Sequence, residues 1–181
     1  THYSSLGAFP FVAGVDGVGR CADGAPIYFF APTAPFGGLA ERTLVPDAHC
    51  VALPESLAPH LAAALAIPGM SSWAALKERA RFIAGETVLI NGATGASGSL
   101  AVQIAKHLGA AKVIATGRHQ PTLAALQALG ADSVISLEQD ERALSDAFEP
   151  HFRAGVDVVL DYLWGASARA LLIGAAQALP D

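Results

Sequence analysis

The sequence predicts an α/β protein, in which a parallel sheet is covered by helices on both faces and follows a β-rich region. From residue 85 onward, apolar runs of strand length alternate with helical stretches, the pattern of parallel strands joined by crossover helices. Before that point, proline and glycine are frequent and the apolar runs are short, which is typical of strands broken by turns. We therefore expect a β-rich domain with linking helices over residues 1–80 and the parallel sheet over 81–181.

Composition narrows the class of protein. The 181 residues are 52% hydrophobic and 15% charged, which is enough apolar material for a buried core. The net charge is −5 and the basic residues are dispersed, so we expect no nucleic-acid partner. No apolar run reaches the roughly 18 residues that span a bilayer, so we expect no membrane association. Cys21 and Cys50 are too few for a disulfide framework, and Thr1–Ser5 shows no signal pattern; we expect a cytoplasmic protein.

The β-rich region contains short apolar runs that predict strands. These runs are residues 11–13, 27–30, 43–45 and 50–53. Residues 55–80 are rich in alanine and leucine and predict helix. Because Pro68 and Gly69 interrupt this stretch, we expect two helical segments rather than one.

The alternating region predicts the strands and helices of the parallel sheet in turn. Its strand-forming runs are 87–90, 112–115, 133–135 and 156–160. Its helical stretches are 98–109, 121–129, 141–149 and 166–178. In the first helix, Ala101, Ile104 and Leu108 recur at the spacing of one buried face. The last strand would lie at an edge of the sheet, with unpaired backbone groups.

A glycine-rich loop is the sharpest motif. Asn91–Gly98 reads NGATGASG and lies between the first strand and the first helix of the alternating region. Spaced glycines let the backbone turn tightly and approach a pyrophosphate, and the N–H groups of the next helix then point at the phosphate. This context predicts a dinucleotide site of the Rossmann type. Its expected contacts are Thr94, Gly95, Ala96, Ser97 and Gly98. The alternative is a turn in which the glycines serve packing alone.

The end of the second strand predicts which nicotinamide cofactor binds. An NAD-specific site places an acid about 20 residues past the loop, where it holds the ribose 2′-hydroxyl. Here the stretch reads Thr116-Gly117-Arg118-His119, without a carboxylate. A guanidinium forms a charge-assisted pair with a 2′-phosphate, so Arg118 favours NADPH over NADH, with the Thr116 hydroxyl directed at the same oxygens. The alternative is that Arg118 is a solvated loop residue.

Several segments together resemble the quinone-oxidoreductase branch of the medium-chain dehydrogenase/reductase superfamily. These are Glu86–Gly98 with the following Ala101–Ala110, then Phe11–Gly19, and Pro68–Ser72. The resemblance implies part of a GroES-like substrate domain before a Rossmann domain, an NADPH-dependent oxidoreductase activity and a homodimer. Relative to the family, the chain is expected to begin after the first strands of the substrate domain and to stop after the fourth strand of the Rossmann domain and its helix.

The same resemblance implies further contacts with the cofactor. Ser71 and Ser72 would start a helix at the domain junction, near the nicotinamide, with capping of that helix as the alternative. Leu163, with its neighbours Tyr162 and Trp164, would pass under the nicotinamide ribose. Apolar packing is the alternative account of Trp164.

Departures from the family pattern argue against a metal. The zinc-dependent alcohol dehydrogenases of the superfamily carry Gly-His-Glu where this chain has Gly14-Val15-Asp16, and a zinc-ligand cysteine where it has Pro68. Valine and proline cannot coordinate zinc, so we expect no metal. Asp16 could be a buried polar group near the site or a turn residue. Hydride transfer without a Lewis acid suits acceptors that are already electron-poor, so the expected substrate is a quinone or an α,β-unsaturated carbonyl.

Other functions stay open from the sequence. A reductase of enoyl thioesters would share the glycine loop and the absence of zinc ligands. A nucleotide-binding module without turnover would share the loop alone. The Tyr-x-x-x-Lys pair of short-chain reductases is missing, because Tyr162 is followed by Ala166 in place of the lysine. The sequence singles out no catalytic residue.

Overall fold

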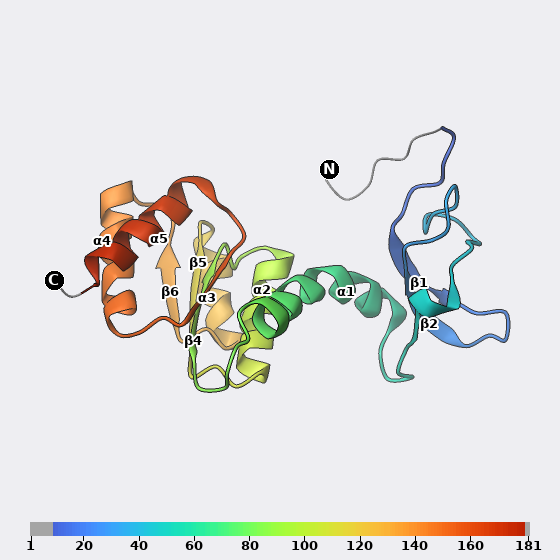
Figure 1. Cartoon of the computed structure of the whole chain (residues 1–181), viewed down its shortest axis with the longest axis horizontal. Helices are drawn as coiled ribbons and strands as arrows, with labels where there is room; N and C mark the ends of the chain where they lie inside the picture. Colours follow the sequence, from blue (N-terminus) through green and yellow to red (C-terminus); the bar gives the residue numbers. More distant parts are fainter. Residues whose placement is uncertain (1–8, 180–181) are drawn as a thin grey trace. The chain divides into compact units, whose positions relative to one another are not determined.

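The computed structural model describes residues 9–179 and divides after Ile67 into two compact units, which we take in turn (Figure 1). Thr1–Ser5, where the sequence shows no signal pattern, lies outside the described residues, as do Pro180 and Asp181. Within the described residues, we find no helix with the length and apolar character needed to cross a membrane.

The first unit contains a three-stranded antiparallel sheet in the order β1-β2-β3. Strand β1 spans Asp16–Arg20, β2 spans Pro26–Phe30, and β3 spans Cys50–Ala52, directly after the short helix η1 (Asp47–His49). The ring of Phe29 lies across β1, so close that a Cβ at Gly17 would be 2.9 Å from its Cζ. This contact makes Phe29 the buried centre of the small sheet.

Two of the four apolar runs predicted as strands in this region are not strands. The runs at 27–30 and 50–53 correspond to β2 and β3. Those at 11–13 and 43–45 form loop-to-loop bonds instead: Val12 N donates to Pro35 O at 2.9 Å, and Thr33 N donates to Leu44 O at 2.8 Å. An apolar triplet therefore marks a hydrogen-bonded loop here as readily as a strand.

Helix α1 (Pro59–Ala74) runs through Pro68 and continues into one π-helical turn, η2 (Ala75–Arg79). The prediction of two segments separated at Pro68 is wrong. Proline removes one backbone donor from a helix, and the remaining bonds can carry the helix past it. Consequently Ser71 and Ser72 lie inside a helix and do not start one.

The second unit contains a four-stranded parallel sheet in the order β6-β5-β4-β7. Its strands are β4 (Thr87–Asn91), β5 (Lys112–Gly117), β6 (Ser133–Ser136) and β7 (Val158–Asp161). Its helices are α2 (Ala96–His107), α3 (Gln120–Ala128), α4 (Glu141–Arg153) and α5 (Gly165–Gln177). This order is the 3-2-1-4 part of a doubly wound sheet, so the predicted fold class is confirmed.

Two apolar clusters cover the two faces of this sheet. Val88 and Ile90 of β4 point to the face covered by α2 and α3, and Leu89 points to the opposite face, as the alternation of a strand requires. On that opposite face, Phe148 of α4 and Leu171 of α5 are buried against the sheet. Figure 1 shows α4 and α5 together on one side of the strands and α2 on the other.

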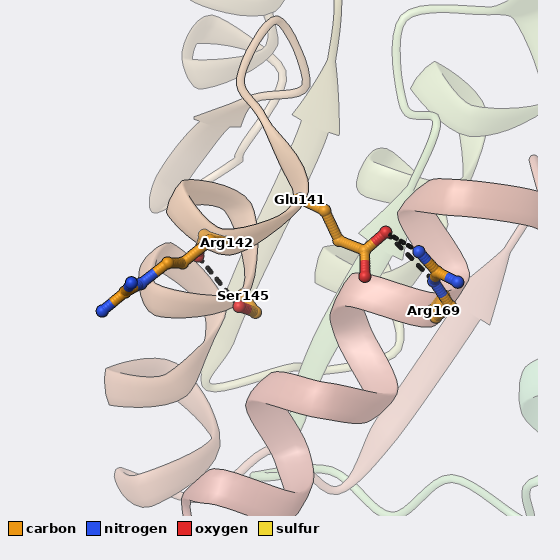
Figure 2. Close-up of polar contacts among 4 residues, drawn as sticks. All are labelled: Glu141, Arg142, Ser145 and Arg169. Carbon is orange, nitrogen blue, oxygen red and sulfur yellow. Dashed lines mark hydrogen bonds and ion pairs between the residues drawn. The ribbon is translucent and has the colours of Figure 1, made fainter.

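Helices α4 and α5 pack closely against each other. Figure 2 shows Glu141 of α4 in an ion pair with Arg169 of α5, whose Nε donates to Glu141 Oε2 at 3.0 Å. One turn further along α4, Ser145 Oγ donates to the Arg142 carbonyl at 2.9 Å. A Cβ at Gly174 would lie 2.8 Å from the Ser145 carbonyl, so glycine permits this approach of the two helices.

Strand β7 lies at an edge of the described sheet, as predicted. It pairs with β4, and Leu160 is buried while Val159 is 41% exposed. The run predicted as 156–160 is therefore covered less completely than its apolar sequence suggests.

Candidate functional site

A cleft of about 500 Å³ lies at the carboxyl ends of the parallel strands. It is walled by the loop after β4, the end of β5 and the segments that follow β6 and β7. The lining residues are Gly92, Thr94, Gly95, Ala96, Ser97, Gly98, Gly117, Arg118, Leu137, Tyr162 and Leu163. Doubly wound sheets bind ligands at this edge, and the volume lies within the roughly 300–1,000 Å³ of small-molecule sites.

Most of the residues predicted to contact a cofactor come together in this cleft. Thr94–Gly98, Gly117, Arg118 and Leu163 all line it, whereas Thr116 and Ser72 do not. The structure shows that the lining residues share one cleft, and contact of any of the predicted residues with a cofactor stays a prediction.

Gly92 and Leu137 line the cleft but were not predicted to contact a cofactor, whereas Tyr162 was expected in the segment near the nicotinamide ribose only as a neighbour of Leu163. Position along the chain is the signal for Leu137 and Tyr162. Leu137 directly follows β6, and Tyr162 directly follows β7, so each stands at the carboxyl end of a strand. Gly92 lies within the glycine loop itself.

Thr116 lies beneath the cleft. Its side chain is fully buried, its Oγ1 donates to Asn91 Oδ1 at 2.8 Å, and the same oxygen accepts from Gly92 N at 3.0 Å. A hydroxyl has a single proton to donate, and here it is bound to Asn91. In this structure the hydroxyl fixes the start of the glycine loop, and the contact of Thr116 with a 2′-phosphate stays a prediction.

Ser72 is likewise fully buried, and its Oγ donates to the Gly69 carbonyl at 3.1 Å. Ser71 Oγ donates to the Pro68 carbonyl at 2.8 Å and lies 3.4 Å from the Tyr162 hydroxyl. The link from this helix to the cleft thus runs from Ser71 through Tyr162. Ser72 packs inside the unit.

The glycines of the loop have different roles. Gly92 has φ +89°, and Leu163 occupies the space beside it, 2.7 Å from where a Cβ would stand. A Cβ at Gly98 would collide with the backbone of Ala93, so Gly98 lets α2 approach β4. Gly95 has φ −85°, and a Cβ there would meet nothing within 4 Å. Gly95 therefore leaves open space at the cleft.

The start of α2 offers donors to an anionic ligand. No side chain caps this helix at Gly95, and the first amide groups of a helix have no carbonyl partner within it. Ala96 and Ser97 line the cleft at this point, where the helix dipole also favours negative charge. Arg118 is exposed at the same cleft, and none of the ion pairs among the described residues involves it.

Asp16, in the first unit, is not a turn residue, and its carboxylate is hydrogen-bonded. It lies in β1 and accepts a hydrogen bond from the Tyr28 hydroxyl at 2.9 Å. Burial, together with this bond and the charge of the carboxylate, raises the pKa of Tyr28 to about 12. No group of three or more potential metal ligands occurs among residues 9–179.

The family model and the relatives that match this chain are described as dehydrogenases or reductases. A family model described as a zinc-binding dehydrogenase matches residues 96–173. The probable NADPH-dependent quinone reductase tdiC of Emericella nidulans is 38% identical over 125 residues, which cover 68% of this chain and 35% of that protein. The trans-enoyl reductase pgmF of Aspergillus terreus is 33% identical over 106 residues, covering 59% and 29%. This chain thus spans about a third of the length of these two relatives.

A solved structure extends the likeness across both units. The quinone oxidoreductase from Thermus thermophilus, also solved in complex with NADPH, is 27% identical to this chain, with a TM-score of 0.67. The match covers 95% of this chain and 69% of that one.

Proposed function

The chain belongs to the quinone-oxidoreductase branch of the medium-chain dehydrogenase/reductase superfamily, and on that premise we propose that it binds NADPH and reduces a quinone or an α,β-unsaturated carbonyl. The observation that carries the proposal is the open space at Gly95, framed by the uncapped start of α2 and by the exposed Arg118. When bound, NADPH supplies a hydride to the acceptor.

In this proposal, the second unit provides every contact with the nucleotide. The amide groups of Ala96 and Ser97 would donate to the pyrophosphate, and Gly95 would leave room for it. Arg118 would pair with the 2′-phosphate, which distinguishes NADPH from NADH. Tyr162 and Leu163 would form the wall on the β7 side of the cleft.

The choice of acceptor is supported by chemistry and by the relatives. An electron-poor double bond or quinone accepts a hydride without a Lewis acid, and Val15 and Pro68 cannot be metal ligands. We therefore propose a zinc-independent reaction. The likeness to a trans-enoyl reductase favours an enoyl thioester as the second candidate substrate. The family resemblance alone supports two further proposals: that the first unit is part of a GroES-like substrate domain, and that the protein is a homodimer. A cytoplasmic location is proposed because the chain has only two cysteines.

Cofactor titration of the full chain tests the nucleotide site. We expect NADPH to bind more tightly than NADH, and Arg118→Ala to weaken NADPH binding by about 10- to 150-fold, the equivalent of about 1.5–3 kcal/mol for a bond to a charged group. NADH binding should not change. Arg142→Ala, which removes an exposed arginine on α4, is the matched control and should leave both affinities unchanged.

Turnover then separates an enzyme from a binding module. Oxidation of NADPH should require an added acceptor, and comparing a quinone, an enone and an enoyl thioester ranks the candidate substrates. Equal affinity of the wild type for NADPH and NADH would contradict the role of Arg118. Binding without oxidation by any acceptor would favour a nucleotide-binding module.

A further inference from the structure

One carboxylate oxygen accepts hydrogen bonds from the backbone of the segment that follows β7. Asp161 is the last residue of β7, and its Oδ1 accepts three hydrogen bonds. The donors are Asn91 Nδ2 at 2.8 Å, Leu163 N at 3.0 Å and Trp164 N at 3.1 Å. Bonds to an ionised acceptor are stronger than those between neutral groups. This oxygen therefore ties the segment after β7 to the end of β4.

Asn91 fixes that carboxylate to the interior of the sheet. It is fully buried, its Nδ2 also donates to Ser167 Oγ at 3.0 Å, and its Oδ1 accepts from Thr116 Oγ1. A buried polar group whose bonds are all satisfied holds its neighbours in one arrangement. The network joins the ends of β4, β5 and β7 to the first turn of α5, below the cleft.

The segment that Asp161 holds has an unfavourable backbone conformation. Trp164 has φ +57° and ψ −164°, a region that residues with a Cβ rarely adopt. Its indole is 78% exposed, so packing of the side chain does not hold it there. Two hydrogen bonds hold the backbone instead. Trp164 N donates to Asp161 Oδ1, and Ser167 Oγ donates to the Trp164 carbonyl at 3.3 Å.

This turn sets the wall of the cleft. It directs Leu163 against Gly92 and brings Tyr162 and Leu163 into the lining. We infer that Asp161 is a positioning residue: without touching the ligand, it holds Tyr162 and Leu163 in the arrangement that receives the nucleotide. The inference rests on the proposed function, since it concerns the same cleft.

Removal of the carboxylate should let the turn relax. In Asp161→Ala, Trp164 can leave its strained conformation, and NADPH binding must then restore it. The affinity should fall by about 5- to 150-fold, the factor that corresponds to the strain of one such residue. Asp161→Asn keeps an oxygen at the same position and should restore most of the affinity. Measurement is by titration of the full chain with NADPH.

A second substitution tests strain as the cause. Glycine adopts positive φ without penalty, so Trp164→Gly in the Asp161→Ala background should recover part of the lost affinity. The matched control is Asp157→Ala. Asp157 directly precedes β7, and its Oδ2 accepts from Thr87 N at 2.8 Å, so it also ties this part of the chain to β4, but at the end of the strands opposite the cleft. Asp157→Ala should leave NADPH affinity unchanged.

The outcomes are distinguishable. A folded Asp161→Ala variant with wild-type affinity would overturn the inference, as would an equal loss in Asp157→Ala or no recovery with Trp164→Gly. If the wild type binds neither NADPH nor NADH, the proposed function fails. The role of Asp161 is then decided by amide hydrogen exchange: protection at Leu163 and Trp164 should fall in Asp161→Ala, and unchanged protection would overturn the inference.

Discussion

The two loops that wall the cleft reach their shapes by opposite means. The loop after β4 relies on missing side chains, with Gly92 at φ +89° and Gly98 in close contact with the backbone of Ala93. The loop after β7 places a tryptophan at φ +57° and holds it through the Asp161 carboxylate. A glycine position needs no support to keep such a backbone, whereas the tryptophan position does. The first loop can adopt its shape because glycines lack side chains, and the second because hydrogen bonds hold it.

The largest effect should come from closing the contact that Gly98 allows. In Gly98→Val, the added side chain meets the Gly92 carbonyl and the Ala93 backbone, and these atoms cannot move aside as a flexible side chain can. Overpacking of this kind costs about 1–3 kcal/mol and in rigid surroundings more. We expect the free energy of unfolding, measured by urea denaturation, to fall by at least that amount. Wild-type stability would contradict the packing described for α2 and β4.

Gly95→Val should act on binding and spare the fold. A Cβ at Gly95 meets nothing within 4 Å and the backbone has φ −85°, which valine tolerates. The branched side chain would instead occupy the space into which the pyrophosphate is proposed to fit. NADPH affinity should fall at least about tenfold, an energy of about 1.4 kcal/mol, with the urea midpoint unchanged. Unchanged affinity would show that the phosphate lies elsewhere.

The sequence treats these two glycines alike, and the structure separates them. Both belong to a spaced-glycine motif between a strand and a helix, and that context is enough to predict the loop and the cleft. The motif does not say which glycine faces solvent and which faces backbone. That distinction depends on the distance between α2 and β4, which is set by tertiary packing.

The parallel sheet could be predicted because each of its strands is an apolar run followed by a helix. The burial of the Thr116 side chain could not be predicted in this way. The apolar run 112–115 ends one residue before it and suggests a loop position, yet β5 continues to Gly117 and buries the hydroxyl. Successive side chains of a strand point to opposite faces, so a small error in where the strand ends changes whether a side chain reaches the cleft.

The segment after β7 shows the other limit of sequence reasoning. The resemblance to the family drew attention to Leu163, but nothing in Asp161–Gly165 marks the carboxylate as an acceptor of three N–H groups. Aspartate close to the end of a strand is common in turns, and its partners here include Asn91, which is 70 positions away in the chain. Such a contact is fixed by the pairing of β4 with β7, and therefore becomes visible in the folded structure alone.

The smallest effect should come from placing a glycine in the loop after β7, as the loop after β4 already has at Gly92. Trp164→Gly removes the unfavourable conformation, a gain of about 1–3 kcal/mol, but glycine also increases the entropy of the unfolded chain by the equivalent of about 0.5–1 kcal/mol. The indole is exposed, so little packing is lost. The free energy of unfolding should therefore rise modestly, by up to about 2.5 kcal/mol.

Arg81→Gly provides the matched control for this change. Arg81 also has positive φ, at +53°, but lies in the connection between η2 and β4, away from the lining of the cleft. Both substitutions should raise the urea midpoint. Amide exchange at Leu163 should become faster in Trp164→Gly alone, because its second loop then has glycine flexibility at positions 164 and 165. A loss of stability in Trp164→Gly would mean that the tryptophan conformation is not strained, and that the two loops differ less than their backbone angles indicate.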